Sequence, residues 1–317
     1  MHPLRPMSVK LGELYAARSG TSLLDLSMTL DSMSKKCTIE QISEAREHLM
    51  LLMMIVGPRT RRLFIAKHLA PVIFIAQPLE FPQLLSLDIQ VMTPSIPNNV
   101  IRELFPFVIK APKLRELGLW NQPMLMPEAL QHNLGTLPYS AITTLRLTKC
   151  TIRTLVMTLL HCTQVVDLEL VDVYGYDANA ANDVEDMDWG MYGLLNGVLY
   201  SPSLRSLKVD VVQQVMQTLL HHTQFPNLQD LYVRRGSAAL MHKASAAPWS
   251  PTLRSISTLS MGGAIPKQWP PALQSVKDLR LLDVKKLTGK SLRTLVDLFP
   301  DSVEVLQIKD DVVWERD

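Results

Sequence analysis

Cysteine is scarce in this chain, with Cys37, Cys150 and Cys162 as the only three among 317 residues. They are irregularly spaced and form no C-x-x-C pair, so they are too few for a disulfide framework. This usage is typical of proteins from a reducing compartment. We therefore expect a cytoplasmic or nuclear protein.

Long apolar runs are also missing. The longest, from Leu49 to Val56, is far shorter than the roughly 20 residues that a membrane-spanning helix needs. The N-terminus has no charged start followed by an apolar signal core. The run could be imagined at a membrane surface, but it has no basic polar face. Core packing is the better interpretation, and we expect no membrane partner.

The chain has neither an excess of one charge nor a catalytic motif. Its 32 Lys and Arg residues nearly balance 30 Asp and Glu residues, and the basic ones are scattered, which argues against nucleic acid as a partner. No G-x-S-x-G, H-E-x-x-H, G-x-x-x-x-G-K or G-x-G-x-x-G motif occurs. The sequence therefore predicts no enzyme and no cofactor.

Histidine and cysteine are adjacent at His161-Cys162, and two histidines are adjacent at His221-His222. By residue type these groups could bind a metal ion. They recur, however, within one repeated segment, because Thr158-Leu-Leu-His-Cys-Thr-Gln164 returns as Thr218-Leu-Leu-His-His-Thr-Gln224. Equivalent corners of a repeat array lie units apart along the array. We therefore expect no metal site.

The clearest feature that is present is a repeat. The pattern L-x-x-L-x-L, with Ile, Val or Met allowed in place of Leu, returns nine times after a weaker copy at Thr60, Leu63, Ile65. The nine copies are Leu84, Leu87, Ile89; Leu114, Leu117, Leu119; Ile142, Leu145, Leu147; Val165, Leu168, Leu170; Leu204, Leu207, Val209; Leu228, Leu231, Val233; Ile256, Leu259, Met261; Val276, Leu279, Leu281; and Val303, Leu306, Ile308. Most steps lie near the roughly 20 to 29 residues of a leucine-rich repeat.

The spacing has a direct structural meaning. The last two apolar positions of each copy lie two residues apart, so both point into the core from one face of a short strand. Between strands, Val211 to His221 and Lys290 to Leu298 have apolar residues at helical spacing. Proline ends the preceding helix just before several strands, at Phe81-Pro82, Ala111-Pro112, Ser201-Pro202, Phe225-Pro226 and Phe299-Pro300.

These features predict an α/β fold. It is a right-handed, horseshoe-like leucine-rich-repeat solenoid, with parallel strands on the concave face and helices on the convex face. Residues 57–317 would form about ten repeats, and residues 1–56 a linker and capping region with a helix and a short strand. Only Cys150 matches the Asn or Cys position of the usual repeat, so we expect irregular units.

The N-terminal region resembles a known family. Leu14-Tyr-Ala-Ala-Arg18-Ser19-Gly20, followed by the alternating Leu24, Leu26 and Met28, is similar to the stretch that links the F-box to the repeats in fungal F-box and leucine-rich-repeat proteins. Downstream, Arg59-Thr-Arg61-Arg62-Leu63 resembles the basic strand start of that family, and the Phe-Pro-x-Leu-x-x-Leu copies resemble its repeats.

The resemblance implies a helical F-box that docks on a ubiquitin-ligase adaptor while the repeats hold the substrate. No Leu-Pro-x-Glu opening of an F-box occurs in this sequence, which begins about ten residues before the linker. The adaptor is therefore expected as a partner only if an F-box is present upstream. The chain as given should not bind it.

The candidate binding residues belong to the predicted concave face. Residues that flank the inward positions point outward and form a column: Asp88, Gly118, Arg146, Glu169, Lys208, Tyr232, Ser260, Arg280 and Gln307, flanked by Trp120, Asp210 and Arg234. Aromatic and arginine side chains are frequent anchors of protein interfaces. The predicted partner-binding residues are Trp120, Arg146, Glu169, Lys208, Asp210, Tyr232, Arg234 and Arg280. An ordinary solvated sheet face would also carry a polar column, so that alternative stays open.

The longest step, between Val165 and Leu204, contains an acidic insertion at residues 172–190. Its members are Asp172, Asp177, Asp183, Glu185, Asp186 and Asp188, together with Tyr174 and Trp189. The glycine and ordered ligand spacing of an EF-hand calcium site are missing. A solvated loop and a partner-contact loop are the remaining interpretations.

The leading functional hypothesis is a protein-interaction scaffold, with the substrate receptor of an F-box-type ubiquitin ligase as its most specific form. The alternative is a leucine-rich-repeat sensor that binds a small or carbohydrate ligand on the concave face. A third is an enzyme without a recognisable motif. A buried pocket with convergent polar groups would favour the sensor, whereas a flat face with an aromatic anchor favours the scaffold.

Overall fold

The computed structural model describes residues 14, 17–28, 51–65, 79–90, 109–120, 138–173, 198–235, 250–263, 273, 275–284, 293, 296–297 and 301–308. The chain divides into two compact units, Met1–Ile142 and Thr143–Asp317, called unit 1 and unit 2 below. Each has α/β character and parallel strands. The boundary that the sequence predicts at residue 56 stays a prediction.

Unit 1 contains four main strands that pair in parallel and in chain order. They are β1 (Leu24–Met28), β2 (Thr60–Ile65), β4 (Ser86–Gln90) and β6 (Glu116–Trp120). A shorter parallel pair, β3 (Leu79–Glu80) and β5 (Ile109–Lys110), precedes β4 and β6. The 3-10 helices of this unit are η1 (Gly57–Arg59) and η2 (Tyr139–Ala141).

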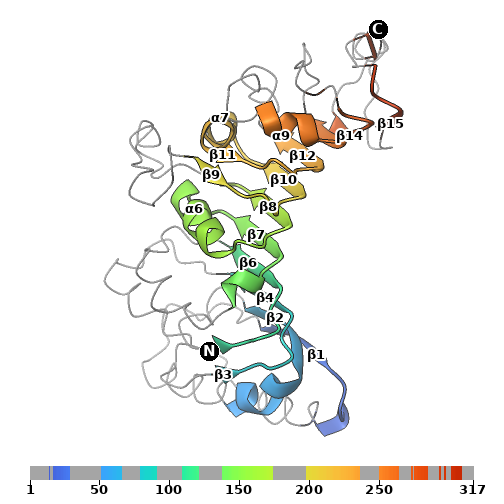
Figure 1. The fold of residues 1–317 in the computed structure, drawn as a ribbon. Coiled ribbons are helices and arrows are strands. Elements are labelled where there is room, and N and C mark those ends of the chain that lie inside the picture. Colours follow the sequence, from blue (N-terminus) through green and yellow to red (C-terminus); the bar gives the residue numbers. More distant parts are fainter. Residues whose placement is uncertain are drawn as a thin grey trace, which may run out of the picture. The chain divides into compact units, whose positions relative to one another are not determined.

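Unit 2 repeats this arrangement over seven main strands, again parallel and in chain order. They are β7 (Thr144–Thr148), β8 (Asp167–Val171), β10 (Ser206–Asp210), β12 (Asp230–Arg235), β13 (Thr258–Gly263), β14 (Asp278–Val284) and β15 (Val305–Ile308). The connections include α6 (Ile152–His161), α7 (Gln213–His222), α9 (Ser250–Ser255) and the short parallel pair β9 (Leu199–Tyr200) and β11 (Thr223–Gln224). Figure 1 shows α6, α7 and α9 on the same side of these strands.

The repeated leucines form the core of both units, as the sequence predicts. In β7, Leu145 and Leu147 are fully buried, while Arg146 between them keeps 39% of its side chain exposed. The same alternation holds in β4, where Leu87 and Ile89 are buried and Asp88 is half-buried. These strands therefore have one face in the core and one face toward solvent, and we call the solvent side of the main strands the open face.

Three of the proline-bearing corners, those at Pro82, Pro112 and Pro226, share one turn geometry. The N–H of Leu84 donates to the carbonyl of Phe81, that of Leu114 to Ala111, and that of Leu228 to Phe225, each at 3.1 Å. In every case proline follows the accepting residue, where its fixed φ suits the turn. The first leucine of these three repeats thus enters the core from the end of a tight turn, directly before its strand.

One hydrogen-bond pattern connects successive repeats of unit 2. The carbonyl of Val166 accepts from the N–H groups of Arg205 and Ser206 at 2.9 and 3.0 Å. The carbonyl of Arg205 accepts in the same way from Gln229 and Asp230 at 2.8 and 3.0 Å. The pattern recurs at the carbonyls of Thr143, Gln229, Ser257 and Lys277. All seven strands therefore start in one register.

The two longer helices carry the internal sequence echo. Its Thr-Leu-Leu-His parts fall at the C-terminal ends of α6 and α7. The helix that the sequence predicts at Val211 to His221 is α7, which begins two residues later at Gln213. Within the segment from Lys290 to Leu298, the described residues Arg293, Val296 and Asp297 are helical. Among the described helices, none has the length and apolarity required to cross a bilayer.

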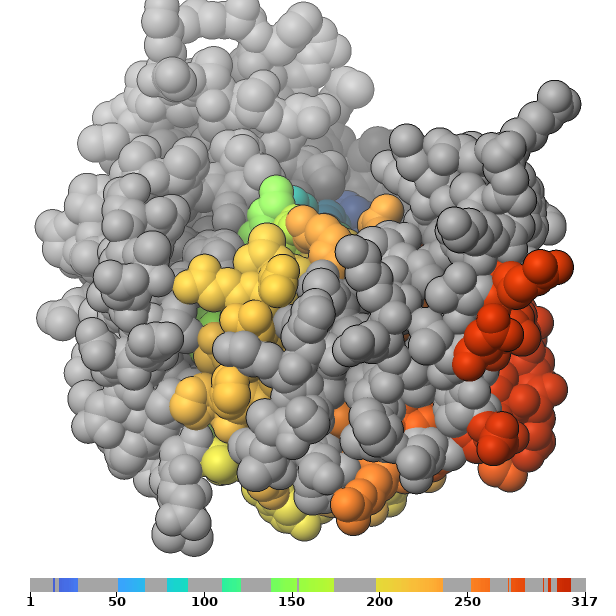
Figure 2. All heavy atoms as spheres, turned by 90° about the horizontal axis from the view of Figure 1, so that it is seen from above, coloured from blue at the N-terminus to red at the C-terminus, as the bar shows by residue number. Residues whose placement is uncertain are grey.

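The strand β15 is more exposed than its neighbours. Figure 2 shows its residues, in red, at the surface of the molecule. Leu306 is 37% exposed, whereas its pairing partner Leu279 in β14 is fully buried. Within the described part of the chain β15 is the last strand of the sheet, so its leucine is covered from one side only.

Candidate partner-binding face

The predicted column of outward residues exists as one row in unit 2. The parallel register places Arg146 opposite Glu169, Glu169 opposite Lys208, and Lys208 opposite Tyr232. It continues through the pairs Tyr232–Ser260, Ser260–Arg280 and Arg280–Gln307. Since adjacent strands are about 4.8 Å apart, these side chains form a contiguous strip on the open face.

Unit 1 carries its own outward row. Asp88 lies opposite Gly118, as predicted, and Phe64 lies opposite Asp88. Sequence reasoning missed Phe64 because its repeat is the weak copy that starts with Thr60. A Cβ built on Gly118 would overlap the Asp88 carboxylate, so glycine leaves the space in which that side chain lies.

Trp120 is an exposed aromatic residue on the open face of unit 1, two residues after Gly118. It ends β6, lies opposite Gln90 and is 36% exposed. The other seven predicted binding residues lie in unit 2. The structure thus brings six of the predicted residues, Arg146, Glu169, Lys208, Tyr232, Arg280 and Asp210, onto one continuous open face, and it places Trp120 on the open face of unit 1.

Some charges of the strip are paired with one another. Arg146 Nε lies 3.8 Å from Glu169 Oε2, and both side chains are 39% exposed. Arg280 donates from Nε and Nη2 to Asp278 Oδ2 at 3.0 and 2.6 Å. The hydrogen bond from Arg280 to Asp278 raises the pKa of the guanidinium, so Arg280 stays charged. Exposed pairs of this kind contribute about 0 to 1 kcal/mol each to stability.

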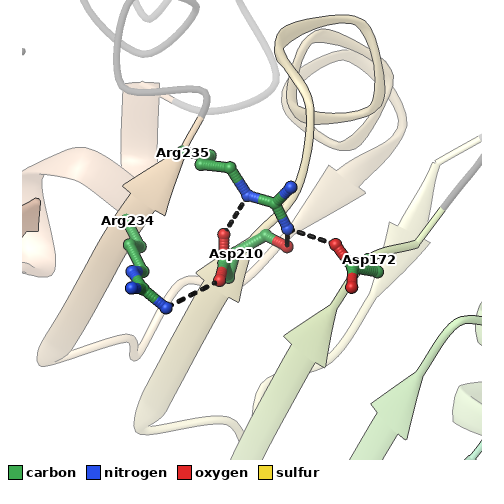
Figure 3. A network of polar contacts seen from close by, with 4 residues as sticks. All are labelled: Asp172, Asp210, Arg234 and Arg235. Carbon is green, nitrogen blue, oxygen red and sulfur yellow. Dashed lines mark hydrogen bonds and ion pairs between the residues drawn. The ribbon is translucent and has the colours of Figure 1, made fainter. Parts of the chain in front are cut away.

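A polar cluster lies at the carboxyl ends of β8, β10 and β12, and we call it the Arg235 cluster. Arg235 donates from Nε to Asp210 Oδ1, from Nη2 to Asp172 Oδ1, and from Nη2 to the carbonyl of Asp210 at 3.0 Å. Arg234 Nη1 lies 3.5 Å from Asp210 Oδ2 (Figure 3). These hydrogen bonds, that to Asp172 first, raise the pKa of Arg235. The cluster therefore ties three strand ends together.

The sequence prediction named Arg234 but missed Arg235, and a bulge explains why. The register between β10 and β12 shifts after Val209, so Asp210 lies opposite Arg235. A bulge adds one residue to one strand and turns the following side chains. The L-x-x-L-x-L spacing ends before this point, so it contains no signal for the bulge. Arg234 instead packs its Cγ near the backbone of Gly262, 3.2 Å from where a Cβ would be.

Asp172 joins the cluster through an unusual backbone conformation. Its φ is +51°, and its N–H donates to the carbonyl of Asp210 at 2.9 Å. Lys149 holds the equivalent place after β7, with φ +52° and an N–H bond to Val171 of 2.8 Å. Aspartate tolerates the left-handed region better than most residues. Of the acidic insertion at 172–190, all residues after Val173 lie outside the described part of the chain.

The described residues offer little metal or thiol chemistry. No group of three or more His, Cys, Asp or Glu that could hold a metal ion occurs among them. Cys150 and Cys162 are free and buried, and burial raises the pKa of each thiol to about 12. Both thiols stay protonated at neutral pH, which makes them poor nucleophiles.

Comparison with known proteins adds little to this picture. No family model and no curated protein sequence matches the chain. Among solved structures, it is similar to a chain in the crystal structure of the Rad7 and Elc1 complex in yeast, at 12% identity. The match covers 97% of this chain and 90% of that chain, with a TM-score of 0.29. A TM-score this low does not establish a shared fold, so nothing is carried over from that complex.

Proposed function

We propose that this chain is a protein-interaction scaffold and that its partner binds the open face of the unit 2 sheet. The observation that carries the proposal is the row from Arg146 to Gln307, which holds its side chains in one register across seven strands. Tyr232 lies near the middle of this row, half-buried between Lys208 and Ser260. A tyrosine side chain that its neighbours already hold loses little conformational entropy on binding, so it can anchor an interface.

The proposed architecture is a right-handed leucine-rich-repeat solenoid whose open face is concave. Its support is the sequential parallel pairing of β7 to β15, the repeated corner geometry and the position of α6, α7 and α9 on one side of the strands (Figure 1). A parallel crossover that returns to the same sheet is almost always right-handed. In such an array every repeat adds one more strand, and with it the exposed side chains of that strand, to the same surface.

The more specific form of the proposal is a substrate receptor of an F-box-type ubiquitin ligase. Its support is the linker-like segment before β1. Arg59 donates to Ser19 Oγ at 3.1 Å and to the carbonyl of Gly20, whose φ of +55° favours glycine. The Arg-Ser-Gly turn is thereby fastened to the start of β2. An F-box upstream of this turn would supply the adaptor contact, while the repeats would hold the substrate.

Affinity capture with the full chain tests the scaffold proposal. Bait proteins are wild type, Tyr232→Ala and the matched control Tyr200→Ala. Tyr200 is an aromatic residue that is 59% exposed in the corner strand β9, outside the main sheet. We expect Tyr232→Ala to weaken a captured partner by about 2 kcal/mol, as at other interface anchors. Tyr200→Ala should capture it normally.

Two results would contradict the proposal. Equal capture by all three baits would mean that the partner does not use Tyr232. Loss of the partner with Tyr200→Ala alone would place the binding surface at the corner of β9 and β11. In both cases the folded state of each variant is checked by circular dichroism, so that unfolding is not mistaken for lost binding.

A further inference from the structure

The charged side chains on the open face of unit 2 fall into two groups. One group is internally paired: Arg146 with Glu169, Arg280 with Asp278, and the members of the Arg235 cluster. The other group consists of Asp167, Lys208 and Asp230, and all three are exposed. Within the described residues, no hydrogen bond or ion pair engages these three side chains.

The unpaired charges are neighbours in the sheet. Ser206 of β10 lies opposite Asp167 of β8 on one side and opposite Asp230 of β12 on the other. The two carboxylates are therefore two strand spacings apart, about 10 Å, with a small half-buried serine between them. Lys208 follows Ser206 by two residues on the same strand, so its side chain leaves from the same face, about 7 Å further along.

Among the described residues, Arg205 and Arg280 are engaged by other groups. Arg205 directs Nη1 to the carbonyl of Asn227 at 3.1 Å, in the corner before β12. Arg280 donates to Asp278, and the electrostatic effect of Asp230 on the pKa of that guanidinium is smaller than that of Asp278. A pair already formed gains little from a new partner, because the old contact must be replaced. Unpaired exposed charges can form a new ion pair without breaking an old one, so they determine the specificity for a partner.

We propose that this patch, defined by Asp167, Ser206, Lys208 and Asp230, binds an arginine and a carboxylate presented two residues apart on an extended partner segment. The proposal rests on the proposed function and names the chemistry of the partner. A guanidinium has donors along two edges of one plane, so a single arginine above Ser206 can donate to Asp167 from one edge and Asp230 from the other. A partner carboxylate then meets the ammonium of Lys208.

The spacing of the partner motif follows from the spacing of the patch. Ser206 and Lys208 are separated by two residues of a strand, and an extended segment running along β10 presents residues i and i+2 with the same separation. The motif is therefore Arg-x-Glu or Arg-x-Asp, or its reverse if the segment runs the other way. Tyr232 is on the same face, opposite Lys208 and diagonal to Ser206, a separation that long and aromatic side chains can span to reach the arginine.

Synthetic fluorescein-labelled peptides test the motif against the full-length chain by fluorescence anisotropy. Probes share one composition in a Gly and Ser background and differ only in order: Arg-x-Glu, Glu-x-Arg, and an order with Arg and Glu adjacent. We expect one of the first two to bind at least about tenfold more tightly than the adjacent order, with an affinity that falls as salt rises.

Variants of the patch provide a second test of the proposal. Asp167→Asn with Asp230→Asn should weaken the preferred peptide by about tenfold, and Lys208→Glu should reverse the preference toward a peptide with Arg-x-Lys. Asp301→Asn is the matched control, because Asp301 is an exposed aspartate in the turn before β15. All substitutions are on exposed side chains, and circular dichroism verifies the fold of each.

Equal affinity for all three peptide orders, or unchanged affinity in the double Asn variant, overturns the proposal. The partner captured in the preceding experiment separates the two proposals. If it depends on Tyr232 but binds the double Asn variant normally, the scaffold function stands and the arginine motif is wrong. If no captured partner depends on the open face, the scaffold function itself fails.

Discussion

Arg234 and Arg235 are adjacent in the sequence but have different surroundings. Arg235 bonds Asp172 and two groups of Asp210, whereas the ion pair between Arg234 and Asp210 is longer, at 3.5 Å. Asp210 is the least exposed carboxylate of the cluster, with 16% of its side chain accessible. Losing Arg235 removes the hydrogen bond from its Nε to that carboxylate and the bonds from Nη2 to the Asp210 carbonyl and to Asp172, which we expect to cost more than losing the longer Arg234 pair.

We therefore expect Arg235→Ala to lower the free energy of unfolding by about 1 kcal/mol and Arg234→Ala by less, since both arginines are about half exposed and solvent screens their charges. Urea denaturation of both variants measures the difference. A double-mutant cycle with Asp172→Ala should show coupling to Arg235. Equal losses for the two arginine variants would argue against the bulged register.

Leu231 tests the core at the same scale. Its side chain is 1% exposed and is one of the repeated leucines of β12. Leu231→Ala should lower the free energy of unfolding by roughly 2 to 5 kcal/mol, because it removes transfer free energy and leaves a cavity. Gln229→Ala, two residues earlier and exposed, is the control. Unchanged thermal stability of Leu231→Ala would mean that the repeat register is misassigned.

Which residues enter the core and which form the open row could be predicted from the sequence. Strand alternation has a period of two, so the spacing of Leu207 and Val209 fixes the side on which Lys208 lies. The Arg235 cluster could not be predicted in this way. Its geometry depends on a bulge after Val209 and on the left-handed backbone of Asp172, and neither changes the spacing of the leucines.

At the scale of elements, the start of α6 depends on Thr151. Its side-chain oxygen accepts from the N–H of Thr154 at 3.2 Å, and the two hydroxyls lie 3.1 Å apart, all buried. Thr151→Ala should lower the free energy of unfolding by about 1 kcal/mol, as for other N-caps. Thr151→Ser keeps the oxygen and should restore most of the loss. If Ser and Ala variants are equally destabilised, packing of the threonine methyl group matters more than the cap.

The strand starts could be predicted more closely than the helix ends. Proline fixes its own φ and shifts the preceding residue away from helix, so Phe225-Pro226 marks the corner before β12 directly. Apolar residues at helical spacing predict that a helix exists but not where its first turn begins. This explains why α7 starts at Gln213 and the prediction placed its start at Val211.

At the scale of the whole molecule, the sequence predicted one solenoid and one strip of binding residues. The structure provides two units, and Trp120 belongs to unit 1 while Tyr232 belongs to unit 2. The spacing of the repeats depends only on each repeat and its neighbours. It therefore contains no information on how a chain divides into larger units. The proposed binding face is therefore confined to the open face of unit 2.

Hydroxyl-radical footprinting of the full chain, with and without its captured partner, tests that claim most directly. The method reports how accessible each aromatic side chain is to solvent. If the partner covers the open face of unit 2, the oxidation rate of Tyr232 should fall severalfold in the complex, while that of Tyr200 in the corner strand β9 stays unchanged. Protection of Tyr200 with no change at Tyr232 would contradict the proposed binding face.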